Sequence, residues 1–389
     1  MSIGVVLFAT TLLEIAMIEI VEVKTKKQQR EFLNFPIKLY DGCPYYVPTL
    51  MIDEKKIFRK DYVYNETCDV AFFLAYEDGK VVGRISAIVQ HASNDKWGQK
   101  RVRFTRFDCV DDQRVADALF DAATEWGKQL GMTEIVGPLG YSDLEREGML
   151  IEGFDQFGTY EEQYNYDYYP KLVENYGFVK DVDWLEHKLY LPNPIDERFI
   201  EVSKRMLERN KCRMVRTTSL NKFLKQYGRQ FFEIIDATYD RLYGTVPFTE
   251  KMMDVMVGNF KMIARPQDIA LLVNEDDKVV GFAIMFPSIS EAVTKSKGRL
   301  TLPFLFNFLK AKRHPKILDL GLIGVLPEYE TRGIASVMIG LLMELIAENK
   351  DFDHLETNLT LEENVHILNM LKRFDKVFNK RRRCYKKDI

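Results

Sequence analysis

The chain has 389 residues, of which 46% are hydrophobic, and its formal net charge is −3 from 55 basic and 58 acidic residues. The length exceeds that of one typical domain and the apolar fraction is that of a globular protein, so we expect two domains with sizeable cores. The nearly balanced charge gives no general attraction to nucleic acid or to a membrane, and we expect neither as a partner.

Cysteine and histidine usage argues against a metal site. No CxxC pair, no Cys/His cluster with zinc spacing and no HExxH motif occurs in the sequence. Scattered thiols fit a reducing compartment, so we expect a cytoplasmic protein. The five cysteines are Cys43, Cys68, Cys109, Cys212 and Cys384.

The chain begins with MSIGVVLFATTLLEIAMIEI, which is mostly apolar. This stretch lacks the basic start of a signal peptide and contains Glu14, and it is too short and interrupted for a membrane span. MIEIVEV is typical of a first strand. We therefore interpret Met17 as the true start and residues 1–16 as an upstream extension.

The first half then reads as a mixed α/β pattern. AYEDGKVVGRISAIV (75–89) predicts a strand hairpin. RVRFTRFDCV (101–110) predicts a strand, residues 115–132 a helix and IVGP (135–138) a short strand. YEEQYNYDYYP (160–170) indicates a partly buried loop or the wall of a substrate groove.

The second half repeats this order. LYLPNPIDERF (189–199) reads as a connector, because its two prolines disfavour helix and remove ladder hydrogen bonds. VNEDDKVVGFAIMF (273–286) repeats the Glu-Asp turn and Lys-Val-Val-Gly of the first hairpin, which indicates duplicated domains or convergence on a common turn. The tail NKRRRCYKK predicts a final strand with a solvated basic face.

A basic insertion, residues 288–316, separates the second hairpin from the next strand. Its Leu and Phe residues are flanked by Lys and Arg. We interpret it as a surface helix packed on its own domain; a lid or a membrane-touching amphipathic segment are the alternatives.

The stretch PEYETRGIA (327–335) lies where the predicted strand 317–326 passes into the predicted helix 334–349. The helix shows one apolar face at i, i+3, i+4 spacing. Its first N–H groups lack partners and that end carries a partial positive charge, which suits a phosphate. Gly333 and Ala335 let the phosphate approach the backbone, and Arg332 can add a cationic contact.

VLPEYETRGIA resembles motif A of the GNAT superfamily, the acyl-CoA-dependent N-acyltransferases. Val325, Pro327, Tyr329, Gly333 and Ala335 match its pattern, whereas Glu330 stands where the family has Arg or Gln. The resemblance implies that acetyl-CoA or another acyl-CoA binds here. Its pyrophosphate would bind the backbone of Thr331, Arg332, Gly333, Ile334, Ala335 and Ser336, and its pantetheine arm would pair with Val325 and Leu326.

Downstream, LETNLTLEENVHILNMLKRF (355–374) resembles the family's next strand and helix, with Asn364 at a frequent cofactor-binding position. Leu371 stands where many members place a tyrosine that protonates the leaving thiolate. Tyr385 lies in the tail strand and is not assigned to the site, so the general acid is unidentified.

Asp319 occupies the position from which some family members supply a general base, on the strand before motif A. Its role would be to take a proton from the amine, directly or through water. In an apolar strand, loss of solvation should raise the pKa of this carboxyl, which suits a base. Asp319 facing solvent or capping a loop is the alternative.

The first half resembles the same fold without the phosphate cradle. We therefore predict an α/β mixed-sheet protein with two tandem GNAT-like domains, a degenerate one at 17–194 and an acyl-CoA-binding one at 195–389. The implied function is acyl transfer from acyl-CoA to an amine of a small molecule or peptide. A non-catalytic CoA-binding or regulatory protein is the alternative, and the chain can form an oligomer.

Overall fold

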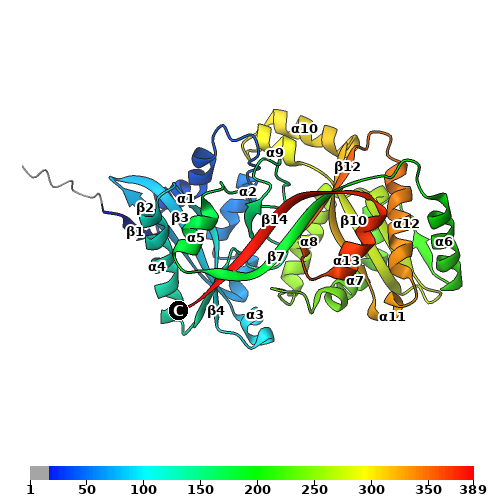
Figure 1. Cartoon of the computed structure of the whole chain (residues 1–389), viewed down its shortest axis with the longest axis horizontal. Helices are drawn as coiled ribbons and strands as arrows, with labels where there is room; N and C mark the ends of the chain where they lie inside the picture. Colours follow the sequence, from blue (N-terminus) through cyan, green and yellow to red (C-terminus); the bar gives the residue numbers. More distant parts are fainter. Residues whose placement is uncertain (1–16) are drawn as a thin grey trace, which may run out of the picture.

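The computed structural model describes residues 17–389, so the interpretation of residues 1–16 as an extension lies outside it. Two α/β halves lie side by side, and one 14-stranded sheet runs through both (Figure 1). This architecture is the predicted mixed α/β fold. Every helix in the described part of the chain is too short or too polar to traverse a bilayer.

The first half contains each predicted element, including the first strand that MIEIVEV predicts. Its elements are β1 (Glu19–Glu22), α1 (Lys26–Leu39), α2 (Met51–Glu54), β2 (Cys68–Glu77), β3 (Lys80–Gln90), α3 (His91–Trp97), β4 (Arg101–Cys109), α4 (Gln113–Gln129), β5 (Glu134–Gly137), β6 (Met149–Glu152), α5 (Tyr169–Asn175) and β7 (Val179–Tyr190).

The second half repeats the order with additional helices. Its elements are α6 (Glu197–Arg209), β8 (Arg213–Val215), α7 (Leu220–Tyr239), α8 (Glu250–Ile263), β9 (Ile269–Val273), β10 (Val279–Pro287), α9 (Ser290–Lys295), α10 (Leu302–Arg313), β11 (Ile317–Val325), α11 (Pro327–Glu330), α12 (Ile334–Ala347), β12 (His354–Thr357), β13 (Thr360–Leu361), α13 (Val365–Met370) and β14 (Asp375–Asp388).

The predicted connector is shorter than expected. Strand β7 continues through Tyr190 and helix α6 begins at Glu197, so only residues 191–196 connect the halves. The strand extends this far because its end pairs with β12 and β14, a partnership that local sequence does not reveal.

Both predicted hairpins form. Strands β2 and β3 pair from Cys68↔Gln90 to Glu77↔Lys80, and Asp78 and Gly79 take positive φ angles of 49° and 70° in the two-residue turn. Strands β9 and β10 pair around a longer turn in which Asp277 has a φ of 61°. Two positive φ angles in a two-residue loop match the right-handed twist of the flanking strands.

The two halves exchange their last strands. The end of β14 pairs with β5 of the first half, while the end of β7 pairs with β12 of the second half. Between these ends, β7 and β14 pair with each other from Tyr190↔Asp375 to Val179↔Lys386. Figure 1 shows the two long strands crossing from one half to the other. The predicted domain boundary at residue 194 stays a prediction. Cutting the chain there would leave each half without the strand that the other half supplies to its sheet.

Charged side chains lie buried along this strand pair. The ammonium of Lys380 is 2.9 Å from Glu186 and 3.5 Å from Glu356. Arg382 Nε is 2.6 Å from Glu186 and 3.2 Å from Glu162. Because buried charges are costly unless each has a partner, this network fixes the register of β7 against β14.

Helix α12 is buried around most of its circumference, whereas the sequence predicts one apolar face. Helix α6 covers the side that the prediction leaves to solvent, and Ser203 Oγ lies 2.7 Å from where a Cβ on Gly340 would sit. The two helices therefore pack closely enough to require glycine at this position.

The insertion packs against the other half, not only against its own domain. Helix α9 and Phe304 of α10 share a hydrophobic cluster with Val47 and Leu50. The amide N–H of Met51 also donates to the carbonyl of Gly298. The expectation that this segment packs on its own domain is therefore incomplete, because the residues that receive it are some 250 positions away in sequence.

The buried ionic network gives a prediction about stability. Lys380→Met leaves Glu186 and Glu356 with one cation fewer inside the protein, and we expect the free energy of unfolding to fall by about 3–5 kcal/mol. Denaturant unfolding measures this change. Lys295→Met, which removes an exposed pair with Glu291, is the matched control and should cost less than about 1 kcal/mol. Equal losses in both variants would contradict a stabilising role for the network.

Candidate active site

Strands β11 and β12 begin as a parallel pair and then diverge. Their pairing covers only Ile317↔His354 to Leu320↔Thr357. Beyond it, residues 321–325 continue along β10, while residues 360–361 turn to pair with β7. A cavity of about 790 Å³ extends from between the diverging strands to the junction of the two halves.

A bulge at Gly321 marks the point of divergence. The register of β10 against β11 passes from Ile284↔Leu322 to Met285↔Leu320, which leaves Gly321 unpaired. A Cβ at Gly321 would lie 2.4 Å from the ring of Phe286, so only glycine fits here. The bulge bends β11 away from β12 and opens the cavity.

The hydroxyl of Tyr239 binds the diverging part of β11. It donates to the carbonyl of Ile323 at 3.0 Å and accepts from the N–H of the same residue at 3.1 Å. Leu326 is engaged on the opposite edge, since its N–H donates to the carbonyl of Val280. Backbone N–H and C=O groups alternate in direction along a strand. Those of Ile323 and Val325 therefore point to the open edge of β11, whereas the N–H of Leu326 points to β10.

The N-terminus of α12 is open at the backbone. Gly333 is its N-cap residue with a φ of 78°, and among the described residues no side chain caps the helix. A Cβ at Gly333 would also lie 3.0 Å from Met206. Glycine is thus required here by backbone conformation and packing, as well as by the phosphate approach that the sequence suggests.

The corresponding helix of the first half is closed. Asp112 caps α4, and its carboxylate accepts from the N–H of Arg114 at 2.9 Å. A carboxylate occupies the place that a phosphate oxygen would need, so this end of α4 does not offer an anion site. This difference gives the physical basis for a first half without the cradle.

Some of the predicted cofactor residues line the cavity and the others do not. Val325, Ala335 and Asn364 line the cavity together with Glu330. Thr331 and Arg332 are exposed, Gly333 and Ser336 are half-buried, and Leu326 and Ile334 are buried in the core. Their roles in binding acyl-CoA stay predictions.

Two side chains around the cradle, Arg332 and Asn364, have clear local partners. Arg332 lies over the ring of Tyr329 at 4.8 Å, so the structure holds its guanidinium to one side of the turn. Asn364 caps α13 by accepting from the N–H of Ile367, and it also lines the cavity. Leu371, which stands at the position of the tyrosine in many GNAT proteins, lies in the cavity wall.

Tyr385 is remote from this site. Its side chain is buried in the core of the first half, and its hydroxyl donates to Glu174 at 3.0 Å. The strand exchange carries β14, and Tyr385 with it, out of the second half.

Asp319 lies on the paired part of β11, opposite Glu356 of β12. It lines a side pocket of about 20 Å³, room for one water molecule, which shares the walls of the main cavity at Tyr160, Glu161 and Asn358. Asp319 Oδ1 is buried without a hydrogen-bond partner in the described structure. Burial, followed by the negative charge of Glu356, raises the pKa of Asp319 to about 8. The predicted rise by loss of solvation is confirmed.

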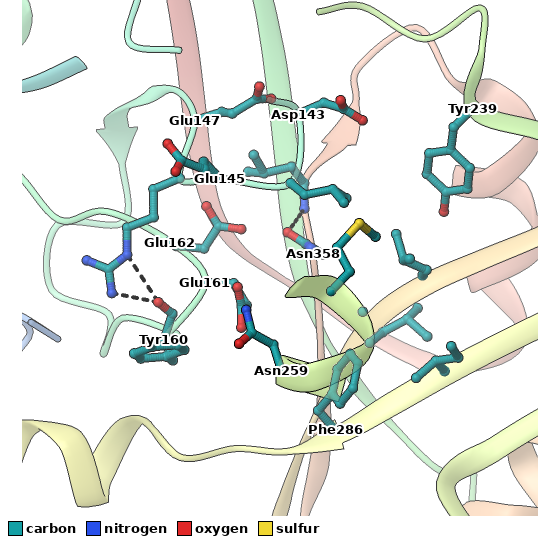
Figure 2. Close-up of a pocket in the computed structure, with 18 of the residues that line it drawn as sticks. Asp143, Glu145, Glu147, Tyr160, Glu161, Glu162, Tyr239, Asn259, Phe286 and Asn358 are labelled. Atoms are coloured by element: carbon teal, nitrogen blue, oxygen red, sulfur yellow. Dashed lines mark hydrogen bonds between the residues drawn. The ribbon is translucent and has the colours of Figure 1, made fainter. Parts of the chain in front are cut away.

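Five carboxyl groups form an acidic wall where the first half meets the cavity (Figure 2). Asp143, Glu145 and Glu147 lie on one loop, and Glu161 and Glu162 on another. Burial raises the pKa of all five, that of Glu162 to about 8. Glu147 is only 4% exposed, and neither a hydrogen bond nor an ion pair to it is found among residues 17–389.

The cations that line the cavity already have partners. Arg84 pairs with Asp108 at 2.8 Å and Arg106 with Glu54 at 2.6 Å. Arg146 donates to the carbonyl of Tyr160 at 2.6 Å, a contact drawn in Figure 2. The acidic wall therefore keeps an excess of carboxyl groups that a cationic ligand can satisfy.

The sequence analysis missed this wall. Its only local signal is the alternation of acids in the stretch SDLEREG (142–148). Of the tyrosine-rich loop, Tyr160 and Tyr164 line the cavity, while Tyr168 and Tyr169 stack against each other and Tyr169 is buried. The loop is thus partly buried, as one alternative predicts, and the substrate groove stays a prediction.

Apolar side chains form the wall opposite the carboxyl groups. In Figure 2, Tyr239 and Phe286 lie across the cavity from Glu145. The apolar lining comes from α7, α8, β10, β11 and α13: Leu224, Phe231, Phe232, Ile235, Val255, Met256, Phe260, Met262, Ile263, Ile284, Phe286, Leu320, Leu322, Ile323, Ile367 and Met370.

Comparison with known proteins defines the class of this fold. A solved tandem GNAT protein from the clavulanic acid biosynthesis pathway matches 96% of this chain and 98% of its own, with a TM-score of 0.53 and 11% identity. The chain has the tandem GNAT fold, as the sequence predicts.

Two curated proteins are similar over nearly the whole chain. Protein YghO of Escherichia coli K12 is 27% identical over 373 residues, which cover 94% of each chain. A bacterial ceramide synthase of Caulobacter vibrioides is 25% identical over 383 residues, covering 96% of this chain and 98% of that protein. No model of a known protein family matches the sequence.

Burial of Asp319 predicts a pH-dependent stability. Its pKa is higher in the folded protein than in the unfolded chain, so the folded state binds the extra proton and wild-type stability falls as pH rises from about 4 to 8. Asp319→Asn cannot ionise. We expect its advantage in free energy of unfolding over wild type to be roughly 3 kcal/mol larger at pH 8 than at pH 5, because each pH unit in this range changes the wild-type stability by about 1.4 kcal/mol.

Thermal and denaturant unfolding at several pH values measure this advantage. The exposed Asp375→Asn is the control and should keep the wild-type profile. Parallel profiles for Asp319→Asn and wild type would show that Asp319 is not held protonated by the fold.

Proposed function

We propose that the protein is an N-acyltransferase that moves an acyl group from acyl-CoA to an amine. The observation that carries this proposal is the cavity between the diverging strands, which is bordered by the open N-terminus of α12, by the side pocket of Asp319 and by the acidic wall. Donor, base and acceptor sites thus adjoin one space. The tandem GNAT fold supports the same reaction class.

The donor enters on the side of the second half in this proposal. The uncapped N–H groups of Ile334, Ala335 and Ser336 bind the CoA pyrophosphate through hydrogen bonds and the helix dipole. The pantetheine arm follows the open edge of β11 at Ile323 and Val325 and displaces the hydroxyl of Tyr239. The extended apolar wall favours an acyl chain longer than acetyl.

The acceptor enters on the side of the first half. Its ammonium binds the acidic wall, where Glu147 has no other partner within residues 17–389. Asp319 then takes the proton as the amine becomes nucleophilic, directly or through the water that the side pocket can hold. The amine nitrogen attacks the thioester carbonyl carbon, the C–N bond forms, the C–S bond breaks, and the CoA thiolate takes up a proton and leaves as the thiol.

The apolar wall and the name of one curated relative favour a lipid amine as the acceptor. Ceramides are N-acylated amino lipids, so the relative named bacterial ceramide synthase supports N-acylation of an amine that carries a long hydrocarbon chain. Acidic groups at one end of the cavity and apolar groups at the other suit such an amphiphile.

A second candidate is a CoA-binding or regulatory protein without transfer activity. Two observations favour it: Glu330 brings a carboxylate to the cavity near the cradle, and Tyr239 occupies the backbone groups of Ile323. Release of CoA from acyl-CoAs of increasing length, with a panel of lipid amines, separates the candidates. Acyl-CoA binding without release by any acceptor would favour the second.

Ser336→Asp tests the donor site without disturbing the glycine turn. An acid in the first turn favours the helix, but it repels a pyrophosphate bound to the same N–H groups. We expect the variant to stay folded and to bind acyl-CoA at least about tenfold more weakly by calorimetry. Asn221→Asp adds the same charge to the first turn of α7 and is the control. Unchanged affinity in Ser336→Asp would place the pyrophosphate elsewhere.

Glu147→Gln tests the acceptor site. It removes the carboxylate that would pair with the bound ammonium, with little change in shape, so the KM for the amine should rise about tenfold or more while affinity for acyl-CoA is kept. Steady-state kinetics with each substrate varied separate the two effects. The exposed Glu208→Gln serves as control. A rise in the KM for acyl-CoA alone would refute this assignment.

A further inference from the structure

Helix α10 presents an uncovered apolar stripe. Leu302, Leu305, Phe306 and Leu309 are 85%, 50%, 71% and 40% exposed. Their spacing of i, i+3, i+4 and i+7 puts them on one face of the helix. Single exposed apolar residues are common on proteins, whereas a continuous stripe on one helix marks a surface that binds something.

The helix is not held by this stripe. Its other face packs Phe304 and Phe308 into the cluster with Val47 and Leu50, and Thr301 caps its N-terminus by accepting from the N–H of Phe304. The fold of α10 is thus secured from the inner side. The outer leucines and phenylalanine keep 40–85% of their surface exposed, and this exposure needs another explanation.

The segment around the stripe is strongly basic. Between Glu291 and Asp319 the sequence contains no acidic residue. Within residues 17–389, no ion pair is found for Arg299, Lys310 or Arg313. The basic residues of this segment are Lys295, Lys297, Arg299, Lys310, Lys312, Arg313 and Lys316.

The same side of the molecule leads to the cavity. Lys312 of α10 donates to the carbonyl of Met262 at the end of α8. Met262 and Val255 line the cavity and are 45% and 43% exposed, so the cavity reaches the surface along α8. Figure 1 shows α9 and α10 together at one edge of the molecule, above the junction of the halves.

We propose that α10 docks the protein on the surface of an anionic lipid membrane. The stripe inserts at the boundary between headgroups and acyl chains, and the basic residues contact lipid phosphates. Docking brings the opening along α8 next to the bilayer, from which an amphiphile can enter the cavity. This proposal departs from the expectation of no membrane partner, because net charge averages over the chain and conceals a local basic segment.

Charge favours a membrane over a protein partner as the occupant. The stripe is short and lies on one convex helix, and the flanking lysines and arginines match the phosphates of anionic lipids. Docking on lipid does not require the proposed acyl transfer, because it is a binding property of the whole chain.

Vesicle flotation of the full chain tests the proposal. The probes are vesicles of phosphatidylcholine alone and of phosphatidylcholine mixed with phosphatidylglycerol. We expect wild type to float with the anionic vesicles and much less with the neutral ones. Phe306→Glu should lower partitioning about tenfold or more, because the variant lacks one aromatic side chain that inserts into the bilayer. Lys310→Glu should lower partitioning to anionic vesicles several-fold, and this loss should become smaller at high salt.

Val202→Glu on α6 is the matched control, since it places a glutamate on a half-exposed helical position of another face. It should keep wild-type partitioning, and circular dichroism should show all variants folded. Absence of wild-type binding to anionic vesicles would overturn the proposal, as would equal losses in Val202→Glu and Phe306→Glu. A dimer that Phe306→Glu dissociates, seen by light scattering without lipid, would also overturn it and assign the stripe to a second copy of the chain.

Discussion

The pairing of β7 with β14 is the constraint on which the rest of the structure depends. These strands run through both halves, and each completes the sheet of the half in which it did not begin. Glu186, Lys380 and Arg382 are buried along the pair, and Glu162 and Glu356 complete the network of opposite charges. Since a shift in register would separate these groups, the network also fixes how the two halves face each other.

That fixed arrangement produces the cavity. The second half supplies an open helix N-terminus and a strand that diverges at a glycine bulge, and the first half supplies carboxyl groups. Neither half alone contains both kinds of wall. Helices α4 and α12 differ between the halves in the same way. The Asp112 side chain caps the N-terminus of α4, whereas Gly333 leaves the first N–H groups of α12 without a side-chain cap.

The ionic network also connects the two acidic regions. Glu356 lies beside Asp319 and contacts Lys380, and Lys380 contacts Glu186. Glu186 contacts Arg382, which reaches Glu162 in the acidic wall. A charge bound at either place acts on a buried chain of ions with little water to screen it. Asp319 and the acidic wall therefore share one electrostatic environment.

The sequence by itself determined the elements and the class of fold. Hairpins, strands and helices follow from turn residues and apolar periodicity, which are local. The two motif-like stretches VLPEYETRGIA and LETNLTLEENVHILNMLKRF contain Val325, Ala335 and Asn364, which line one cavity in the structure. Only the tertiary structure decided the strand exchange, the removal of Tyr385 to the first half, the cover of α6 over α12 and the acidic wall. These depend on contacts between residues far apart in the chain, and such contacts leave no periodic signal in the sequence.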